Sequence, residues 1–426
     1  MTTRSSCPAC LGSDVSVFLE IERVPTHCHV LRWSRDEAAA APRGDIRLGH
    51  CRACGLIFNV AFDPERMSYA GAYENSLAWS PRFSAYARGL ATRLIARHDV
   101  RGKRVVEIGC GQGDFLALLC AEGGNRGIGF DPCETAARGG QRRTDGVTIV
   151  REPYSAAAAG GAPDFVCCRH VLEHIASPRE FLVELRASLG TRADTVVFFE
   201  VPNALATFED LAIWDIIYEH CSYFTATSLR RVFEAAGFAV LDIRTDFEEQ
   251  FLSLEAVPVV SGSSDPMGDL DGSPKPPRRS GAARGTRAAP RDRARPLIGQ
   301  LDGSPEPPLS RHLRRFQARF RHTVRTWDDR LRRQLDAGSR VVVWGAGSKA
   351  VTFLNVVPSA RRLEYVVDIN SRKRGAYVPG TGQQMVGPDF LLEHRPDVVL
   401  VMNPAYAAEI RQAMAGLGIT ADLIDV

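Results

Sequence analysis

The feature that most constrains the fold of this chain is an apolar strand that runs directly into a glycine-rich turn. The segment Val105-Val-Glu-Ile-Gly-Cys-Gly-Gln-Gly-Asp114 reads as a strand, a turn and the start of an apolar helix. Further strand-like stretches follow at 127–131, 164–168 and 195–201, with helix-like stretches between them. Strands that alternate with helices in this way predict a doubly wound, Rossmann-like α/β domain.

A second strand, glycine turn and helix lies near the C-terminal end, at Val341-Val-Val-Trp-Gly-Ala-Gly-Ser-Lys349, and Asp368 follows its second strand. Such a turn can bind a phosphate or nucleotide at the helix N-terminus, or it can be purely structural, and the residues leave both interpretations open. Residues 258–308 are rich in Pro, Gly, Ser and Arg, which predicts a disordered linker. Apolar residues then recur every three or four positions over 309–335, which predicts a long amphipathic helix.

Two Cys-x-x-Cys pairs precede the first α/β unit. Each turn directs two thiolates at a common point, so the two pairs predict a closed tetrahedral site for a structural Zn²⁺. The expected metal ligands are Cys7, Cys10, Cys51 and Cys54, and His27, Cys28, His29 and His50 are spare donors nearby. A closed site leaves this metal no catalytic position.

Composition excludes several classes of protein. Apolar residues make up 45% and charged residues 24% of the chain, and no apolar run approaches the roughly 20 residues of a membrane span. The first ten residues lack the apolar core of a secretory signal, so we expect a cytoplasmic protein without a membrane partner. The basic tract over 275–340 lacks interleaved aromatic residues outside the amphipathic face, so a nucleic-acid partner is not expected.

The first glycine turn also suggests a cofactor. The pattern Glu-x-Gly-x-Gly-x-Gly lacks the G-x-G-x-x-G spacing of dinucleotide-binding turns and resembles motif I of class I S-adenosylmethionine (SAM) methyltransferases. Asp131 closes the second strand, where a carboxylate can accept hydrogen bonds from both ribose hydroxyls of an adenosine. The expected SAM-binding residues are Glu107, Gly109, Gly111, Gly113 and Asp131.

The segment Trp214-Asp-Ile-Ile-Tyr-Glu-His-Cys-Ser-Tyr-Phe-Thr225, preceded by Glu200-Val-Pro-Asn203, carries a more specific resemblance. It looks like the sugar C-methyltransferases of antibiotic deoxysugar pathways, in which a zinc module, a methyltransferase domain and a C-terminal Rossmann-like domain follow in this order. That family has a Tyr-His-Glu-His sequence whose last His is the general base, which implies this role for His220 with Glu219 beside it. Ile217 and Tyr218 depart from the family sequence.

The resemblance extends to two further segments. The stretch Cys168-Arg-His-Val-Leu-Glu-His-Ile175 resembles the segment that borders the methyl donor, and Tyr69-Ala-Gly-Ala-Tyr-Glu-Asn-Ser76 resembles the one that closes over donor and substrate. The family's Gly-Gly-Ser-Leu-Arg-like strand is replaced by Glu248-Glu-Gln-Phe-Leu-Ser-Leu-Glu255, which suggests a different acceptor. Packing roles are also compatible with these residues. The expected catalytic set is His220, Glu219, Tyr218, His174 and Tyr73.

The sequence hypothesis is thus an α/β enzyme with a zinc-binding module over 1–62, a SAM-dependent methyltransferase domain over 63–257, a linker over 258–308, and an amphipathic helix with a C-terminal Rossmann-like domain over 309–426. The resemblance implies C-methylation of a small-molecule acceptor, a nucleotide-activated keto-deoxysugar or a related carbonyl compound. Two alternatives remain open. One is a methyltransferase that acts on oxygen or RNA, and the other is a catalytically silent nucleotide-binding scaffold.

Overall fold

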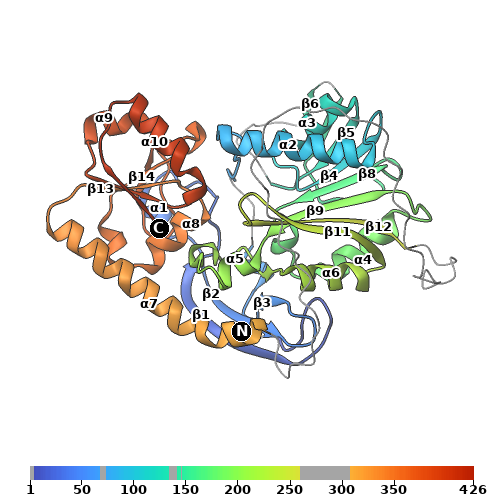
Figure 1. Ribbon diagram of the computed structural model, residues 1–426, viewed down its shortest axis with the longest axis horizontal. Helices are drawn as coiled ribbons and strands as arrows, with labels where there is room; N and C mark the ends of the chain where they lie inside the picture. Colours follow the sequence, from blue (N-terminus) through green and yellow to red (C-terminus); the bar gives the residue numbers. More distant parts are fainter. Residues whose placement is uncertain (1–3, 68–72, 134–141, 145, 260–307) are drawn as a thin grey trace, which may run out of the picture.

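The computed structural model describes residues 4–67, 73–133, 142–144, 146–259 and 308–426. Its strands form three sheets, which belong to the N-terminal module, the central domain and the C-terminal domain (Figure 1). The expected linker over 258–308 lies almost entirely outside the described residues. Within those ranges, no helix has both the length and the apolar character needed to cross a membrane.

The N-terminal sheet has four antiparallel strands in the order β1-β2-β3-β10. Their bounds are β1 Val15–Pro25, β2 Arg43–Cys51, β3 Ile57–Asn59 and β10 Ser222–Tyr223. The last strand comes from the middle of the chain, directly after the Glu219-His220 segment, and pairs with β3. This pairing attaches the N-terminal module to the segment expected to carry the catalytic base.

The central sheet has eight strands in the order β11-β12-β9-β8-β4-β5-β7-β6. The strands from β9 to β7 are parallel, and the pairs at the two edges of the sheet are antiparallel. The bounds are β4 Arg104–Ile108, β5 Arg126–Phe130, β6 Arg142–Thr144, β7 Val147–Val150, β8 Phe165–Arg169, β9 Val196–Pro202, β11 Phe238–Asp246 and β12 Phe251–Pro258. The expected α/β domain is confirmed.

Helices cover the faces of this sheet (Figure 1). Ser80 caps the first of them by accepting a hydrogen bond from Phe83 N–H, and Pro81 occupies its first turn, where no amide donor is required. The bounds are α2 Pro81–His98, α3 Asp114–Gly123, α4 Pro178–Ser188, α5 Ala204–Phe208 and α6 Ala226–Ala235.

The C-terminal sheet has five parallel strands in the order β15-β14-β13-β16-β17. The strands are β13 Val341–Trp344, β14 Tyr365–Val367, β15 Gln384–Val386, β16 Val398–Val401 and β17 Asp422–Asp425. The helices are α8 Ser348–Val356, α9 Leu391–His394 and α10 Ala407–Gly416. This is the Rossmann-like unit that the second glycine turn predicts.

The expected amphipathic helix is confirmed as α7, Pro308–Asp336, which runs below the C-terminal domain to the N-terminal sheet (Figure 1). Its apolar side chains Leu313, Phe316, Phe320 and Leu331 are buried. Phe316 meets the ring of Phe18 from β1 with a centroid separation of 6.2 Å. One apolar cluster thus joins the N-terminal sheet, α7 and the C-terminal domain, because a module this small cannot bury its own apolar face.

Candidate functional site

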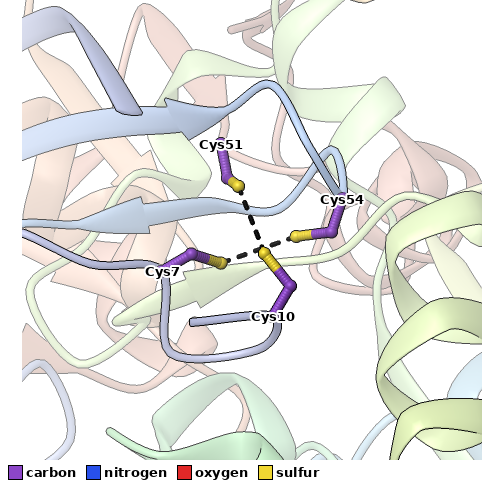
Figure 2. Close-up of side chains that lie close together, drawn as sticks. All are labelled: Cys7, Cys10, Cys51 and Cys54. Atoms are coloured by element: carbon purple, nitrogen blue, oxygen red, sulfur yellow. Dashed lines mark hydrogen bonds between the residues drawn. The ribbon is translucent and has the colours of Figure 1, made fainter. Parts of the chain in front are cut away.

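The four expected zinc ligands converge beside the start of the N-terminal sheet (Figure 2). All four sulfur atoms lie within 4.8 Å of one another. The Cys7 and Cys54 sulfurs are 3.5 Å apart, as are those of Cys10 and Cys51. The hydrogen bond between Cys7 and Cys54 lowers the pKa of Cys7 and raises that of Cys54, so one of the two thiols holds the proton that both share. Four clustered thiols match the donor set of a structural zinc site.

The first glycine turn borders a cavity of about 560 Å³ at the carboxyl ends of β4 and β5. Gly109, Gly111 and Gly113 all have positive φ angles. A residue with a side chain would strain the backbone at these positions, so the turn requires glycine there. A Cβ at Gly109 would lie 2.1 Å from a methyl group of Val171, whereas a Cβ at Gly111 would meet nothing within 4 Å. The turn therefore leaves open space at Gly111, as a ligand-binding loop must.

Two carboxylates line this cavity. Glu107 is buried, its Oε2 has no hydrogen-bond partner among the described residues, and burial raises its pKa to about 8. Asp131 accepts hydrogen bonds from the amides of Gly111 and Cys133, at 2.7 and 2.9 Å. These bonds fix the carboxylate at the end of β5 and leave it lone pairs for a ligand. The residues present fit an adenosine cofactor.

A second cavity, of about 320 Å³, lies between the central and C-terminal domains. It shares residues Tyr73, Asn75, Ser76, Leu77, His170 and His174 with the first cavity. The far wall belongs to the C-terminal glycine turn and includes Gly345, Gly347 and Lys349. A donor in the first cavity and an acceptor in the second would therefore meet along this shared border.

His220 and His174 lie together in the second cavity, with ring centroids 5.0 Å apart. The Nδ1 atoms of both are buried without a hydrogen-bond partner among the described residues. Burial lowers the pKa of His220 to about 3, and the positive charge of His170 contributes; burial also lowers the pKa of His174 to about 4. Both rings are therefore neutral at neutral pH, with free lone pairs.

Glu219 is fully buried and does not bond to the neighbouring His220. Its Oε2 accepts a hydrogen bond from the Cys28 amide at 2.7 Å, and its Oε1 accepts one from the Tyr73 hydroxyl at 3.1 Å. Burial raises the pKa of Glu219 to about 7. Glu219 therefore does not orient His220 by a direct hydrogen bond, because consecutive side chains leave the backbone in different directions.

Tyr218 lies outside both cavities. Its hydroxyl accepts a hydrogen bond from the Asp63 amide at 2.9 Å, and its ring packs on Phe62 with centroids 5.3 Å apart. Of the expected catalytic set, only His220, His174 and Tyr73 line a cavity; Glu219 does not, although it bonds to Tyr73, and Tyr218 contacts neither cavity. Its position indicates a packing role between the N-terminal module and the central domain.

Two residues that line the second cavity were not predicted as site residues from the sequence. His29 was only a spare zinc donor, yet it lines the cavity beside Tyr73, with ring centroids 5.6 Å apart. His170 has an uncommon positive φ of 54°, and its Nε2 lies 2.9 Å from Glu200. Burial alone would lower the pKa of His170, but the carboxylates of Glu173 and Glu200 raise it to about 9. No local pattern marks His29, whereas the Arg-His pair after a strand could have marked His170.

The C-terminal wall is tied to the central domain by polar contacts. Lys349 Nζ lies 3.1 Å from Asp215 Oδ2 and 3.5 Å from Gln250 Oε1. Gln250 also accepts a hydrogen bond from Asn403 at 3.0 Å. Gln250 belongs to the segment in which this chain departs from the resembling family. The departure therefore lies in the wall of the second cavity.

Two family models match the chain. One, described as a methyltransferase domain, matches residues 78–243, and the other, described as a C-methyltransferase C-terminal domain, matches residues 309–420. Together they cover most of the central and C-terminal domains, including both glycine turns and His174 and His220. Other residues that line the second cavity, such as His29, Tyr73 and Gln250, lie outside both matches.

The C-methyltransferase NovU of Streptomyces niveus is 25% identical over 390 residues, which cover 89% of this chain and 85% of NovU. Among solved structures, the chain resembles a putative S-adenosylmethionine dependent methyltransferase from Listeria monocytogenes (15% identity, TM-score 0.32, 41% of this chain and 99% of that one). It also resembles magnesium protoporphyrin IX methyltransferase from Synechocystis PCC 6803 (17% identity, TM-score 0.32, 45% and 91%). TM-scores this low support no further conclusion. The two family models and the similarity to NovU over most of both chains show that this chain belongs to the SAM-dependent C-methyltransferase family.

Proposed function

We propose that the chain methylates a carbon next to the carbonyl of a nucleotide-activated keto-deoxysugar, with His220 as the general base. The observation that carries this proposal is the buried, unpartnered Nδ1 of His220 in the second cavity. Removal of an α-proton requires an unprotonated base in reach of the acceptor, and a neutral imidazole is such a base.

The surroundings of His220 suit this role. Its Nδ1 atom is buried without a hydrogen-bond partner among the described residues, so this is the atom that takes up the proton. The pKa of about 3 keeps this atom unprotonated before the reaction. The enolate formed by proton removal is negative, so it stabilises the imidazolium beside it and raises its proton affinity at that moment.

The shape of the second cavity supports the choice of acceptor. It reaches from His220 to the C-terminal glycine turn, where a Cβ at Gly347 would meet nothing within 4 Å. The N-terminus of α8 and the Lys349 ammonium could hold a diphosphate there while the sugar lies against His220. A longer, anionic acceptor therefore fits this cavity better than a small uncharged ketone.

The cofactors follow from the two residue sets already described. When bound, SAM supplies an electrophilic methyl group. Glu107, Asp131 and the glycine turn would hold it in the first cavity, and Ser76 donates a hydrogen bond to Asp114 at 3.2 Å across the mouth of the site. The cysteine cluster would hold Zn²⁺ as a structural ion, since four thiolates leave no open position for substrate.

The test is His220→Asn, which keeps the size and polarity of the side chain but removes the basic lone pair. Purified protein is incubated with SAM and a panel of nucleotide-activated keto-deoxysugars in deuterated water, and exchange and methylation at carbon are followed by mass spectrometry. The exposed His322 provides a matched control, His322→Asn.

We expect exchange and methylation at carbon in the wild type and in His322→Asn, and loss of both in His220→Asn with SAM affinity unchanged. Full activity of His220→Asn would remove this residue from the mechanism. SAM binding without exchange or methylation on any member of the panel would overturn the choice of acceptor.

A further inference from the structure

Three side chains converge where the two cavities meet. Glu173 and His174 are consecutive residues of the 3₁₀ turn Leu172–His174, and His220 approaches them from the segment before β10. One ligating atom from each residue lies within 4.8 Å of the others. Ligands of a metal about 2 Å from each lie roughly 3 to 4 Å apart, so small side-chain rotations would close this set.

The polar atoms of this group lack the partners that burial demands. Both carboxylate oxygens of Glu173 and the Nδ1 atoms of His174 and His220 have no hydrogen-bond partner among the described residues. The nearest cationic contact of Glu173 is His170 Nδ1, at 3.7 Å, which is too far for a hydrogen bond. Buried polar atoms are almost always partnered, so four unpartnered atoms in one place indicate a missing ligand.

The Nδ1 atoms of His174 and His220 are the ring atoms available to an ion, because both are buried without a hydrogen-bond partner among the described residues. Backbone groups of Glu219 and Asp215 act on the two imidazoles, on His174 and His220 respectively, and favour their protonated forms. In metal sites, a ligating histidine commonly donates its other ring N–H to a backbone carbonyl or a carboxylate, which fixes the lone pair toward the metal.

We propose that Glu173, His174 and His220 form a second metal site that takes one Zn²⁺ or a similar first-row transition ion. Two imidazoles and one carboxylate form a borderline donor set that prefers such ions to Ca²⁺ or Mg²⁺. Three protein ligands leave at least one open position, unlike the closed cysteine cluster, so this ion exchanges more readily.

Occupation of this site has a consequence for catalysis that rests on the proposed function. The ion takes the Nδ1 lone pair of His220, and a ligated lone pair cannot accept the α-proton. Excess Zn²⁺ therefore inhibits the enzyme reversibly, while the zinc in the cysteine cluster stays in place.

The experiment titrates Co²⁺ into the full-length protein, whose cysteine cluster is first filled with Zn²⁺. Co²⁺ bound to histidine and carboxylate gives weak ligand-field absorption in the visible range without thiolate charge-transfer bands. The same titration is made with Glu173→Gln, with His174→Ala and with the control His322→Asn. Circular dichroism confirms that each variant is folded.

We expect one additional equivalent of Co²⁺ in the wild type and in His322→Asn, and affinity on the order of 100-fold weaker or lost in Glu173→Gln and His174→Ala. Absence of this equivalent, or its retention in both ligand variants, would overturn the site. These results need no turnover, so they stand if the acceptor is wrongly assigned. Where deuterium exchange is measurable, exchange that persists at saturating Zn²⁺ would overturn the inhibition.

Discussion

The hydroxyl of Tyr73 donates a hydrogen bond to Oε1 of Glu219 across 3.1 Å, in the interior of the protein. The other carboxylate oxygen of Glu219 accepts the Cys28 amide. One buried carboxyl group thus holds together the N-terminal module, the segment that borders both cavities and the segment of the proposed base. We propose that Glu219 is a positioning residue, which acts on His220 through the backbone that they share.

This relationship predicts the effect of Tyr73→Phe. Loss of the hydroxyl leaves a buried carboxyl oxygen without its donor, which we expect to lower the free energy of unfolding by about 1–3 kcal/mol. Chemical denaturation measures the change. Tyr365→Phe, in a ring that packs on Phe390 in the C-terminal domain, is the control and should cost less. Equal losses in the two variants would show that the bond to Glu219 contributes little.

The glycine turn allows a matched pair of substitutions. Gly111 and Gly190 have φ angles of 54° and 61°, and a Cβ at either would meet nothing within 4 Å. Both Gly→Ala variants should therefore lose a similar stability, about 1–2 kcal/mol. Only Gly111→Ala places a methyl group in the first cavity, so only it should weaken SAM binding in calorimetry. Unchanged SAM affinity in Gly111→Ala would exclude this turn from the cofactor site.

The cysteine cluster predicts the metal content of the protein. We expect one tightly held zinc per chain after dialysis against EDTA, measured by elemental analysis, because four thiolates form a closed site. Cys51→Ser should lose this zinc and melt at a lower temperature. Cys120→Ser, which alters a buried cysteine of α3, should retain it. Zinc retained in Cys51→Ser would contradict the assignment of the ligands.

Burial of Glu107 predicts a dependence of stability on pH. Its pKa is raised to about 8, so the folded protein binds a proton that the unfolded chain releases near its ordinary value of 4.5. The stabilisation is complete below that value and is lost as the pH rises through 8, by about 1.4 kcal/mol per pH unit between the two pKa values. Denaturation of the ligand-free protein from pH 5 to 8 measures this slope, and Glu107→Gln should flatten it. If the free energy of unfolding depends on pH equally steeply in Glu107→Gln, the proton bound on folding belongs to another group.

Lys349 predicts how the acceptor is held. Lys349→Met removes one of the two lysine side chains that line the second cavity, so the KM for a nucleotide-activated acceptor should rise at least tenfold while kcat changes little. Steady-state kinetics with the active member of the acceptor panel provides the measurement. Lys103→Met, which alters a lysine that neither cavity contains, is the control. A large fall in kcat with unchanged KM would instead connect Lys349 to the chemical step.

Local sequence patterns predict many of the elements of this fold. The alternation of strands and helices, the two glycine turns and the apolar stripe of α7 depend on residues close together in the chain, so their periods and spacings can be read directly. The paired cysteines belong to the same class, because each Cys-x-x-Cys turn defines its own geometry. Domain boundaries and the roles of single site residues remain predictions.

The sequence by itself determined which chemical groups are present, including a SAM-type loop, four thiols and a Glu-His pair. Only the tertiary structure decided which of them meet. His29 lines the second cavity. Glu219 accepts hydrogen bonds from Cys28 and Tyr73 rather than from His220. Tyr218 is buried against Asp63, away from both cavities. Glu219 and Cys28 are 191 positions apart, and such a contact arises only when β10 pairs with β3 and the modules bury a common apolar core. No local propensity encodes a contact of that kind.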